Sequence, residues 1–462
     1  MNEYDSSTMA SLLSSQYQMV RSPEDADLII VNTCSIRHKA EHKLYSLIGR
    51  FKGYKKKRPG LRIAVSGCVA QQEGERLFKR MPYLDLVFGP QGLYRLPQLL
   101  QELEQGAENL LDTAMHEDFK IPSVYRKDGC PDPVRGFVTI MQGCNNFCTY
   151  CIVPYVRGRE ISRSAMDILH EIGDLVELGV RDITLLGQNV NSYGKGAGDV
   201  VGFAQLLRMI DKEYPGIRLR FTTSHPKDIS REVMECFGSL DTLCEHLHLP
   251  VQAGSNKVLK RMNRHYTRED YLEKVHFLRQ VSPEIALTTD LICGFPGETH
   301  KDFLDTLSLV EEVRYHQAFA FKYSPRPGTA AARFACQVDD GTKSQRLTLL
   351  LGLLNRIGFQ EMRNLEGTVQ EVLVERVHSG QPGMLQGRTR GNHVVNFPGV
   401  PEMVGSFLDV EIVRACNHSL VGRLSEAVDP AREMRGKMAG QSVLKEDVSY
   451  EDSSNVCACD NP

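Results

Sequence analysis

The sequence of 462 residues lacks the features of a membrane or secreted protein. No apolar run approaches the roughly 20 residues that a membrane-spanning helix needs. The opening residues, Met1–Asp5, contain neither the basic segment nor the apolar segment of a signal peptide. Trp is absent, and this absence excludes no fold class. We therefore expect no membrane partner.

The chain also lacks a large net charge. Its 55 Lys and Arg residues nearly balance its 58 Asp and Glu residues, which gives a net charge of −3. Such a chain has no overall field that attracts nucleic acid, so any RNA contact must come from local basic patches. The composition, 41% hydrophobic and 24% charged, is typical of globular proteins. The length exceeds that of one ordinary core and predicts two to four domains.

The thirteen cysteines do not have the pattern of a disulfide framework. Their number is odd, and several lie in apolar, strand-like runs. In a chain of this size, clustered cysteines more often bind metal or take part in catalysis, which favours a cytoplasmic protein. Cys457 and Cys459 lie in the terminal segment and are assigned no role. Six cysteines lack metal-ligand spacing and are expected to be buried: Cys130, Cys236, Cys244, Cys293, Cys336 and Cys416.

Residues 1–111 are expected to form a parallel α/β domain. Short apolar strands alternate with helices, which is the pattern of βαβ units. The strands are predicted at residues 27–34, 61–68 and 84–88, and the helices at 4–16, 36–51 and 71–81. Residues 112–133 are rich in Pro and Gly towards their end and have linker composition.

Residues 134–342 repeat a strand–helix unit six times. Six units predict a partial (β/α)6 barrel, open where a full (β/α)8 barrel would close. Ligands of such folds bind at the C-terminal ends of the strands. The strands are expected at 137–141, 183–186, 219–223, 246–251, 286–293 and 317–323, with helices between them, such as 164–178 and 300–313.

Three further segments complete the chain. Residues 343–366 are predicted to form an amphipathic connector helix. Residues 367–428 contain short strands and turns that predict a small antiparallel β-barrel. Residues 429–462 are polar, charged and unpatterned, and are expected to be disordered. The barrel strands are predicted at 368–377, 384–388, 393–397 and 407–413.

Three cysteines directly after the first barrel strand form the strongest signal in the chain. Cys144, Cys148 and Cys151 have the spacing Cys-x3-Cys-x2-Cys, which allows a tight loop to direct three sulfurs at one volume. Thiolates are soft ligands that suit iron–sulfur clusters. A [4Fe–4S] cube held by three thiolates has one iron without a protein ligand. That iron can bind a substrate or cofactor through nitrogen and oxygen.

The alternatives for this loop are a zinc site and three buried thiols. Zinc needs a fourth ligand, usually from a second Cys-x2-Cys pair or a nearby His. No His lies between residues 117 and 169. The iron–sulfur interpretation is therefore favoured.

The loop and its place in the chain resemble the radical S-adenosylmethionine (SAM) superfamily. Residues 1–428 as a whole are similar to the methylthiotransferase family, most closely to its tRNA-modifying MiaB branch. Besides the region 144–159, the resemblance rests on 32–37 (NTCSIR), 66–70 (SGCVA), 186–193 (LGQNVNSY), 248–255 (HLPVQAGS), 289–299 and 387–392 (GRTRGN).

This resemblance implies that SAM binds the open iron and is cleaved reductively to a 5′-deoxyadenosyl radical. The radical would take hydrogen from C2 of N6-isopentenyladenosine at position 37 of tRNA, where a methylthio group is then installed (i6A to ms2i6A). A second SAM would supply the methyl group. The partners implied are tRNA and an electron donor such as flavodoxin or ferredoxin, and the chain is expected to be a monomer.

Cys34 and Cys68 each end a predicted strand of the first domain. In a parallel sheet, the C-terminal ends of the strands lie on one edge, where ligands gather, so the two thiols can converge. From the residues alone, two buried apolar thiols are an equal alternative. The resemblance implies that they are ligands of an auxiliary [4Fe–4S] cluster that supplies sulfur.

Five residues at other strand ends are candidates for SAM binding. Gln188 and Asn189 follow one barrel strand and could meet the ribose or the methionyl group. Gly294, Gly297 and Glu298 lie in a turn after another strand, where the backbone could approach the adenosyl group. In both places an ordinary βα turn is an equal alternative.

The C-terminal barrel carries basic and aromatic residues. Small β-barrels with such a face commonly bind RNA, and the segment resembles a TRAM domain, which implies tRNA binding. A charged barrel surface without that role is the alternative. The candidate RNA contacts are Arg388, Arg390, Phe397, Arg414 and Arg423.

Two other functions are considered. A sister branch of the family modifies a ribosomal-protein side chain, but the 32–37 motif and the 392–397 stretch favour the tRNA branch. The other alternative is an RNA-binding iron–sulfur protein without sulfur insertion.

That last alternative depends on the N-terminus, because the chain is expected to lack its true beginning. A doubly wound domain would place a strand before the helix at 4–16. In the resembling family this strand ends in a cysteine just upstream of a Met-Asn-x-Tyr-Asp-Ser stretch, which residues 1–6 match. The auxiliary cluster would then have only Cys34 and Cys68 from this domain.

Overall fold

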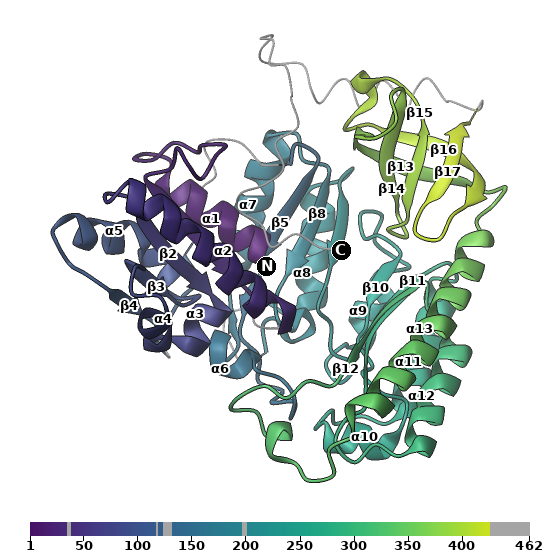
Figure 1. Ribbon diagram of the computed structural model, residues 1–462. Coiled ribbons are helices and arrows are strands. Elements are labelled where there is room, and N and C mark those ends of the chain that lie inside the picture. Colours follow the sequence, from purple (N-terminus) through teal and green to yellow (C-terminus); the bar gives the residue numbers. More distant parts are fainter. Residues whose placement is uncertain (35–37, 117–118, 123–131, 196–200, 426–462) are drawn as a thin grey trace.

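The N-terminal domain contains a four-stranded parallel sheet in the order β1-β2-β3-β4. The computed structural model describes residues 1–34, 38–116, 119–122, 132–195 and 201–425 (Figure 1). The parallel sheet confirms the predicted class. The strands are β1 (Leu28–Thr33), β2 (Arg62–Gly67), β3 (Leu86–Phe88) and β4 (Leu110–Asp112).

Helices cover both faces of this sheet because each face is apolar. One face packs against α2 (His38–Lys57), α3 (Cys68–Glu73) and α4 (Glu75–Arg80). The other packs against α1 (Asn2–Leu13) and α5 (Leu96–Glu104), and η1 (Gly92–Arg95) precedes α5.

Two details of this domain differ from the sequence prediction. The helix expected at 71–81 is split into α3 and α4 at Gly74, whose φ of +50° is outside the helical region. Strand β4 was not predicted, because its three residues lie where the composition changes to that of a linker.

The central domain is a partial barrel of six parallel strands, as predicted. Two three-stranded sheets, β5-β8-β9 and β10-β11-β12, continue into each other through a parallel bridge between Leu219 and Leu243. The strands are β5 (Arg135–Thr139), β8 (Asp182–Leu186), β9 (Arg218–Phe221), β10 (His246–His248), β11 (Ala286–Cys293) and β12 (Gln317–Lys322).

The helices of this barrel are largely those that the sequence predicts. They are α6 (Val153–Arg157), α7 (Ala165–Glu177), α8 (Phe203–Glu213), α9 (Arg231–Cys236), α10 (Asn256–Arg261), α11 (Arg268–Val281) and α12 (His300–Val313). The barrel also contains η2 (Val190–Ser192) and η3 (Ala331–Arg333).

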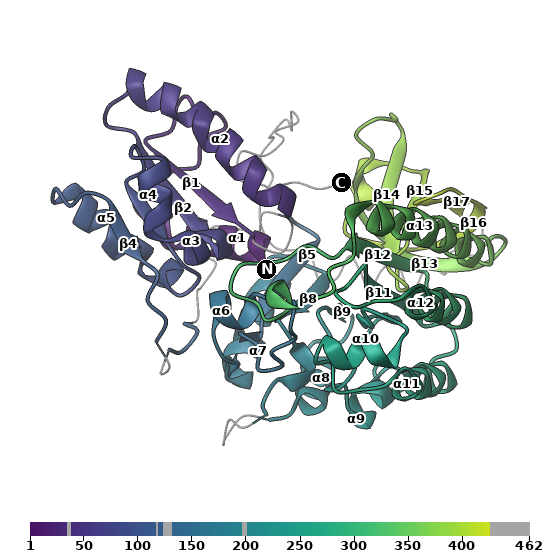
Figure 2. The ribbon, with the colours of Figure 1, turned by 60° about the horizontal axis from the view of Figure 1, so that its bottom comes forward.

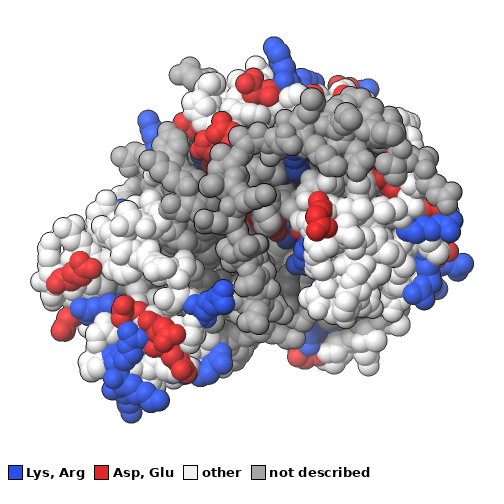
Figure 3. Space-filling model, turned by 90° about the horizontal axis from the view of Figure 1, so that it is seen from above, with Lys and Arg blue, Asp and Glu red and all other residues white. Residues whose placement is uncertain are grey.

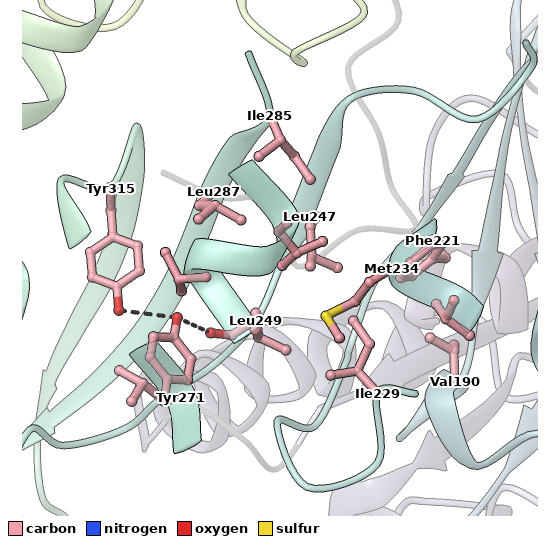
Figure 4. Close-up of a cluster of buried hydrophobic side chains, with 14 of the residues drawn as sticks. Val190, Phe221, Ile229, Met234, Leu247, Leu249, Tyr271, Ile285, Leu287 and Tyr315 are labelled. Carbon is pink, nitrogen blue, oxygen red and sulfur yellow. Dashed lines mark hydrogen bonds between the residues drawn. The ribbon is translucent and has the colours of Figure 1, made fainter. Parts of the chain in front are cut away.

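Buried apolar side chains form one continuous core between these strands and helices. Two tyrosines in this core satisfy each other: Tyr315 donates to the hydroxyl of Tyr271 (3.0 Å), which donates to the carbonyl of Leu249 (3.0 Å; Figure 4). Burial raises the pKa of both hydroxyls, so they remain protonated donors.

The long helix α13 (Asp340–Arg363) connects the partial barrel to a closed five-stranded barrel, the TRAM barrel (Figures 1 and 2). The sequence predicted four antiparallel strands here. A fifth, β17, was missed because Gly422 interrupts a five-residue strand, and it pairs parallel with β15 to close the barrel. The elements are β13 (Val369–Val377), β14 (Met384–Thr389), β15 (Val394–Pro398), η4 (Pro401–Met403), β16 (Phe407–Ala415) and β17 (Leu420–Leu424).

The cysteines without metal spacing are only partly as predicted. Cys236, Cys244 and Cys293 are buried, but Cys336 is exposed and Cys416 is half-buried. Cys336 follows a short turn with φ of +60°, outside any apolar face. The remaining three cysteines, and the expected disorder of 429–462, lie outside the described residues. Among the described helices, none is long and apolar enough to cross a membrane.

Candidate active site

The loop that carries the three cysteines closes on its own base. It follows the short strand β6 (Met141–Gln142), which pairs with β7 (Ile161–Ser162). Gly143 has φ of +84°, and a Cβ atom there would lie 1.9 Å from the carbonyl oxygen of Arg159. The Cys144 N–H donates to the carbonyl of Gly158 (3.2 Å). Only glycine therefore permits the chain to return so closely at position 143.

The thiols of the loop lie in a largely buried setting. Burial raises the pKa of Cys144 to about 11 and that of Cys151 to about 12. Both thiols thus remain protonated at neutral pH until a metal replaces the proton, and iron–sulfur ligation would supply that metal.

Cys148 has a cation and a neutral imidazole beside its sulfur. Nη1 of buried Arg264 donates to Cys148 Sγ (3.4 Å), and Arg264 is held by the carbonyl of Pro250 (2.7 Å). Nε2 of His225 lies 3.8 Å from the same sulfur. Burial, reinforced by Arg264, lowers the pKa of His225 to about 2, so its ring is uncharged.

The three cysteines do not form a tight single-ion site. Within the described residues, no group of three or more His, Cys, Asp or Glu side chains is arranged to hold one metal ion. This arrangement gives no support to the zinc alternative. A [4Fe–4S] cube needs no such tight group, since each thiolate binds a different iron.

Asp228 fixes the cluster loop to the ends of the neighbouring strands. Its carboxylate accepts hydrogen bonds from Asn146 Nδ2 (2.9 Å), Asn189 Nδ2 (2.8 Å) and Lys195 Nζ (2.9 Å). Burial acts to raise the pKa of Asp228, but these hydrogen bonds outweigh it and lower the pKa to about 2. Sequence reasoning missed Asp228, although its place shortly after a barrel strand was a usable signal.

Three buried polar atoms beside this network have no hydrogen-bond partner within the described chain. They are Asn189 Oδ1, Asn191 Nδ2 and Ser224 Oγ. Asn191 Oδ1 accepts from the N–H of His225 (3.0 Å), which places the group beside Cys148. Orphaned buried polar atoms are rare in native proteins and indicate a ligand or water. Their donor and acceptor chemistry fits the amino, carboxylate and hydroxyl groups of SAM.

The two residues predicted after β8 have different tasks. Asn189 lies in the group just described. Gln188 instead accepts from the N–H of Gly143 through Oε1 (2.5 Å), so it supports the base of the cluster loop.

The predicted SAM-binding turn after β11 is closed by the connector helix α13. Glu298 is buried, and its Oε1 accepts from the N–H of Gly294 (2.9 Å) and from Arg346 Nη1 of α13 (2.6 Å). A Cβ atom at Gly294 would lie 2.3 Å from the Lys343 side chain, and Gly297 has φ of +80°. The side-chain geometry therefore favours the ordinary-turn alternative for Glu298.

Cys34 and Cys68 are brought side by side, as predicted. Thr33 and Gly67 are register partners at the ends of β1 and β2, and each cysteine is the next residue. A Cβ atom at Gly67 would lie 2.3 Å from the carbonyl of Thr33, so the strand ends approach closely. The pair fits two ligand positions of a cluster at this sheet edge.

Two of the predicted RNA contacts instead hold the TRAM barrel against the central barrel. Arg390 pairs with Glu245 (2.7 Å), which precedes β10, and Arg388 pairs with Glu375 (3.0 Å). Both arginines are largely buried, so the prediction of exposed RNA contacts is corrected for them. Their charges are used within the protein.

The other three candidates in this barrel also differ from one another. Phe397 is fully buried in the TRAM core, so the prediction that it contacts RNA is wrong: its strand alternation points it inward. Arg423 is exposed but pairs with Glu411 (3.0 Å). Arg414 is exposed, and the described residues offer it no ion pair. On the face seen in Figure 3, Lys and Arg lie in separate groups among acidic residues.

Comparisons with known proteins agree with this architecture. Three family profiles match: the Radical SAM superfamily over residues 138–310, the Uncharacterized protein family UPF0004 over 1–89 and the TRAM domain over 363–425. A tRNA-2-methylthio-N(6)-dimethylallyladenosine synthase of Geobacter metallireducens is 52% identical, covering 92% of this chain and 96% of the relative. The enzyme of the same name from Yersinia enterocolitica is 45% identical, covering 96% of this chain and 94% of the relative.

Solved structures support the fold. The radical S-adenosylmethionine methyltransferase TsrM from Kitasatospora setae superposes with a TM-score of 0.53 at 15% identity, covering 71% of this chain and 67% of that one. At this identity the likeness concerns the fold alone.

Proposed function

The chain belongs to the tRNA-2-methylthio-N(6)-dimethylallyladenosine synthase family of radical SAM methylthiotransferases, and from this premise we propose its substrate and chemistry. It converts N6-isopentenyladenosine at position 37 of tRNA to the 2-methylthio derivative. One SAM serves as the radical source and another as the methyl donor. The observation that carries the proposal is the cluster loop placed beside three orphaned polar atoms, in a chain similar to these synthases over nearly its whole length.

The residues of the radical site divide the work. Cys144, Cys148 and Cys151 hold the [4Fe–4S] cluster, which supplies the electron that cleaves SAM when both are bound. Asp228 keeps the loop and Asn189 in fixed positions. Asn189, together with Asn191 and Ser224, orients the polar groups of SAM.

The charges around the radical site favour an ordered, dry pocket. Arg264 donates to the Cys148 sulfur and offsets part of the negative charge of the cluster thiolates. His225 is neutral and buried, so it adds no charge at neutral pH. The burial of both side chains limits the access of water to this side of the cluster.

A second [4Fe–4S] cluster, with Cys34 and Cys68 among its ligands, is proposed as the source of the inserted sulfur. The support is the placement of both thiols at one sheet edge, together with the contact of that edge with the radical domain through α3 and α6. The ribosomal-protein alternative is not favoured, because the relatives are named for tRNA.

Binding of tRNA is assigned to the TRAM barrel, with Arg414 as the strongest of the remaining candidate contacts and Arg423 as a weaker one. An electron donor such as flavodoxin or ferredoxin reduces the radical cluster. We further propose that the chain acts in the cytoplasm, as a monomer.

The test is conversion of a tRNA that carries N6-isopentenyladenosine at position 37. The anaerobically reconstituted full chain is supplied with SAM and a reductant, and nucleosides are analysed by mass spectrometry. The expected product is the 2-methylthio nucleoside, with 5′-deoxyadenosine. A tRNA with unmodified adenosine at position 37 is the control and should remain unchanged. Production of 5′-deoxyadenosine without any methylthio product would contradict the proposal.

A further inference from the structure

Arg157 lies between the two predicted cluster sites. It is the last residue of α6, which begins two positions after Cys151. Its side chain is only 5% exposed and makes two contacts with the N-terminal domain. Nε donates to Cys68 Sγ (3.3 Å), and Nη2 donates to the carboxylate of Asp5 (2.6 Å).

The contact forms part of a buried seam between the two domains. Helix α3, which begins at Cys68, packs on α6, and α1 approaches β5 (Figure 2). Cys68 also packs with Ile152 and Val156 in a small apolar cluster. A buried guanidinium needs partners, and the Asp5 carboxylate neutralises its charge. The Nε–H remains directed at the sulfur.

The radical site contains the same device. Buried Arg264 donates to Cys148 Sγ (3.4 Å), as Arg157 donates to Cys68 Sγ. At each predicted cluster, one ligand sulfur therefore accepts a hydrogen bond from a buried arginine. Hydrogen bonds to ligand sulfurs and nearby positive charge favour the reduced, more negative state of an iron–sulfur cluster.

We propose that Arg157 is a positioning residue that raises the reduction potential of the auxiliary cluster and holds Cys68 against the radical-site segment. This inference rests on the proposed function, because it requires the auxiliary cluster. Arg157 acts through the sulfur of Cys68 and does not contact the radical loop thiols in the described structure.

The test is a redox titration of the anaerobically reconstituted full chain, followed by electron paramagnetic resonance. Added SAM perturbs the signal of the cluster with the open iron and so separates it from the auxiliary cluster. In R157M, the auxiliary potential should fall by about 59 mV, which corresponds to a tenfold change in the ratio of reduced to oxidised cluster for one electron. The potential of the radical cluster is the internal control and should not move.

Two matched variants separate the sulfur contact from general loosening of the seam. R157K retains the positive charge and should restore part of the potential. D5N retains the arginine–sulfur contact and removes a negative charge, so the potential should rise or stay constant. An unchanged auxiliary potential in R157M, or an equal fall in D5N, would overturn the proposal.

Iron analysis accompanies each titration. Loss of about four irons in R157M but not in D5N would support the positioning role. If the unaltered chain holds only about four irons, no auxiliary cluster forms and the inference fails. If R157M has an unaltered potential while the unaltered chain makes the methylthio nucleoside, the inference alone fails and the proposed function stands.

Discussion

Ser224 is buried and its hydroxyl has no hydrogen-bond partner within the described chain. If this hydroxyl is used by SAM, Ser224→Ala should weaken SAM binding five- to tenfold, since a hydrogen bond contributes about 1 kcal/mol or somewhat more. The stability of the SAM-free protein should be unchanged or slightly higher, because an unsatisfied polar atom is removed. Isothermal calorimetry and thermal unfolding measure both quantities. Reduced stability with unaltered SAM affinity would show that Ser224 is structural.

Cys148 is the most informative of the three loop thiols, because its sulfur contacts both Arg264 and His225. Cys148→Ala should abolish the formation of 5′-deoxyadenosine, as the cluster with an open iron cannot assemble. Binding of tRNA should persist, because it is assigned to another domain. Cys336→Ala is the matched control, since that thiol is exposed and distant in sequence from the loop. Undiminished 5′-deoxyadenosine from the Cys148 variant would refute the assignment.

At the scale of elements, the loop between β6 and α6 depends on one backbone conformation. Gly143→Ala combines a left-handed φ with a contact of 1.9 Å to backbone, so the loop should not close and about four irons should be lost. Gly179→Ala is the control: φ there is +92°, but a Cβ atom would meet no described atom within 4 Å. That variant should lose about 1–2 kcal/mol of stability and retain its iron. Equal iron content in both variants would contradict the prediction.

At the scale of the whole molecule, the TRAM barrel is docked by buried charges. Arg218 donates to the carbonyls of Arg388 (2.5 Å) and Glu371 (2.7 Å), and Arg220 donates to those of Arg390 (2.7 Å) and Thr389 (2.9 Å). Removing the residues after about 365 would strip these partners and leave buried cations exposed or unpaired. Such a truncation should therefore lower the stability of the central barrel as well as the affinity for tRNA.

Point variants separate docking from RNA binding more cleanly. Arg414→Ala should weaken tRNA binding and reduce the slope of log affinity against log salt by roughly one unit, because one phosphate contact is lost. Arg390→Ala should instead lower stability through the loss of its pair with Glu245, with little change of the salt slope. Filter binding at several salt concentrations and thermal unfolding test both. An unchanged slope for Arg414→Ala would remove it from the RNA interface.

The sequence alone determined the elements and the metal chemistry of this protein. Strand–helix periodicity and Pro/Gly punctuation are local properties, so the parallel domain, the six-unit barrel and the connector helix were predicted. The spacing of Cys144, Cys148 and Cys151 is equally local. Register in a parallel sheet also follows from the order of βα units, which is why Cys34 and Cys68 could be expected to meet.

Only the tertiary structure decided which side chains are used internally. Arg388 and Arg390 look like RNA contacts in the sequence, but Glu375 and Glu245 occupy them. These partnerships depend on how two domains dock, and residue type does not encode docking. For the same reason, neither the contact of Arg157 with Cys68 nor the orphaned hydroxyl of Ser224 could be predicted, because both arise where segments far apart in the chain close on each other.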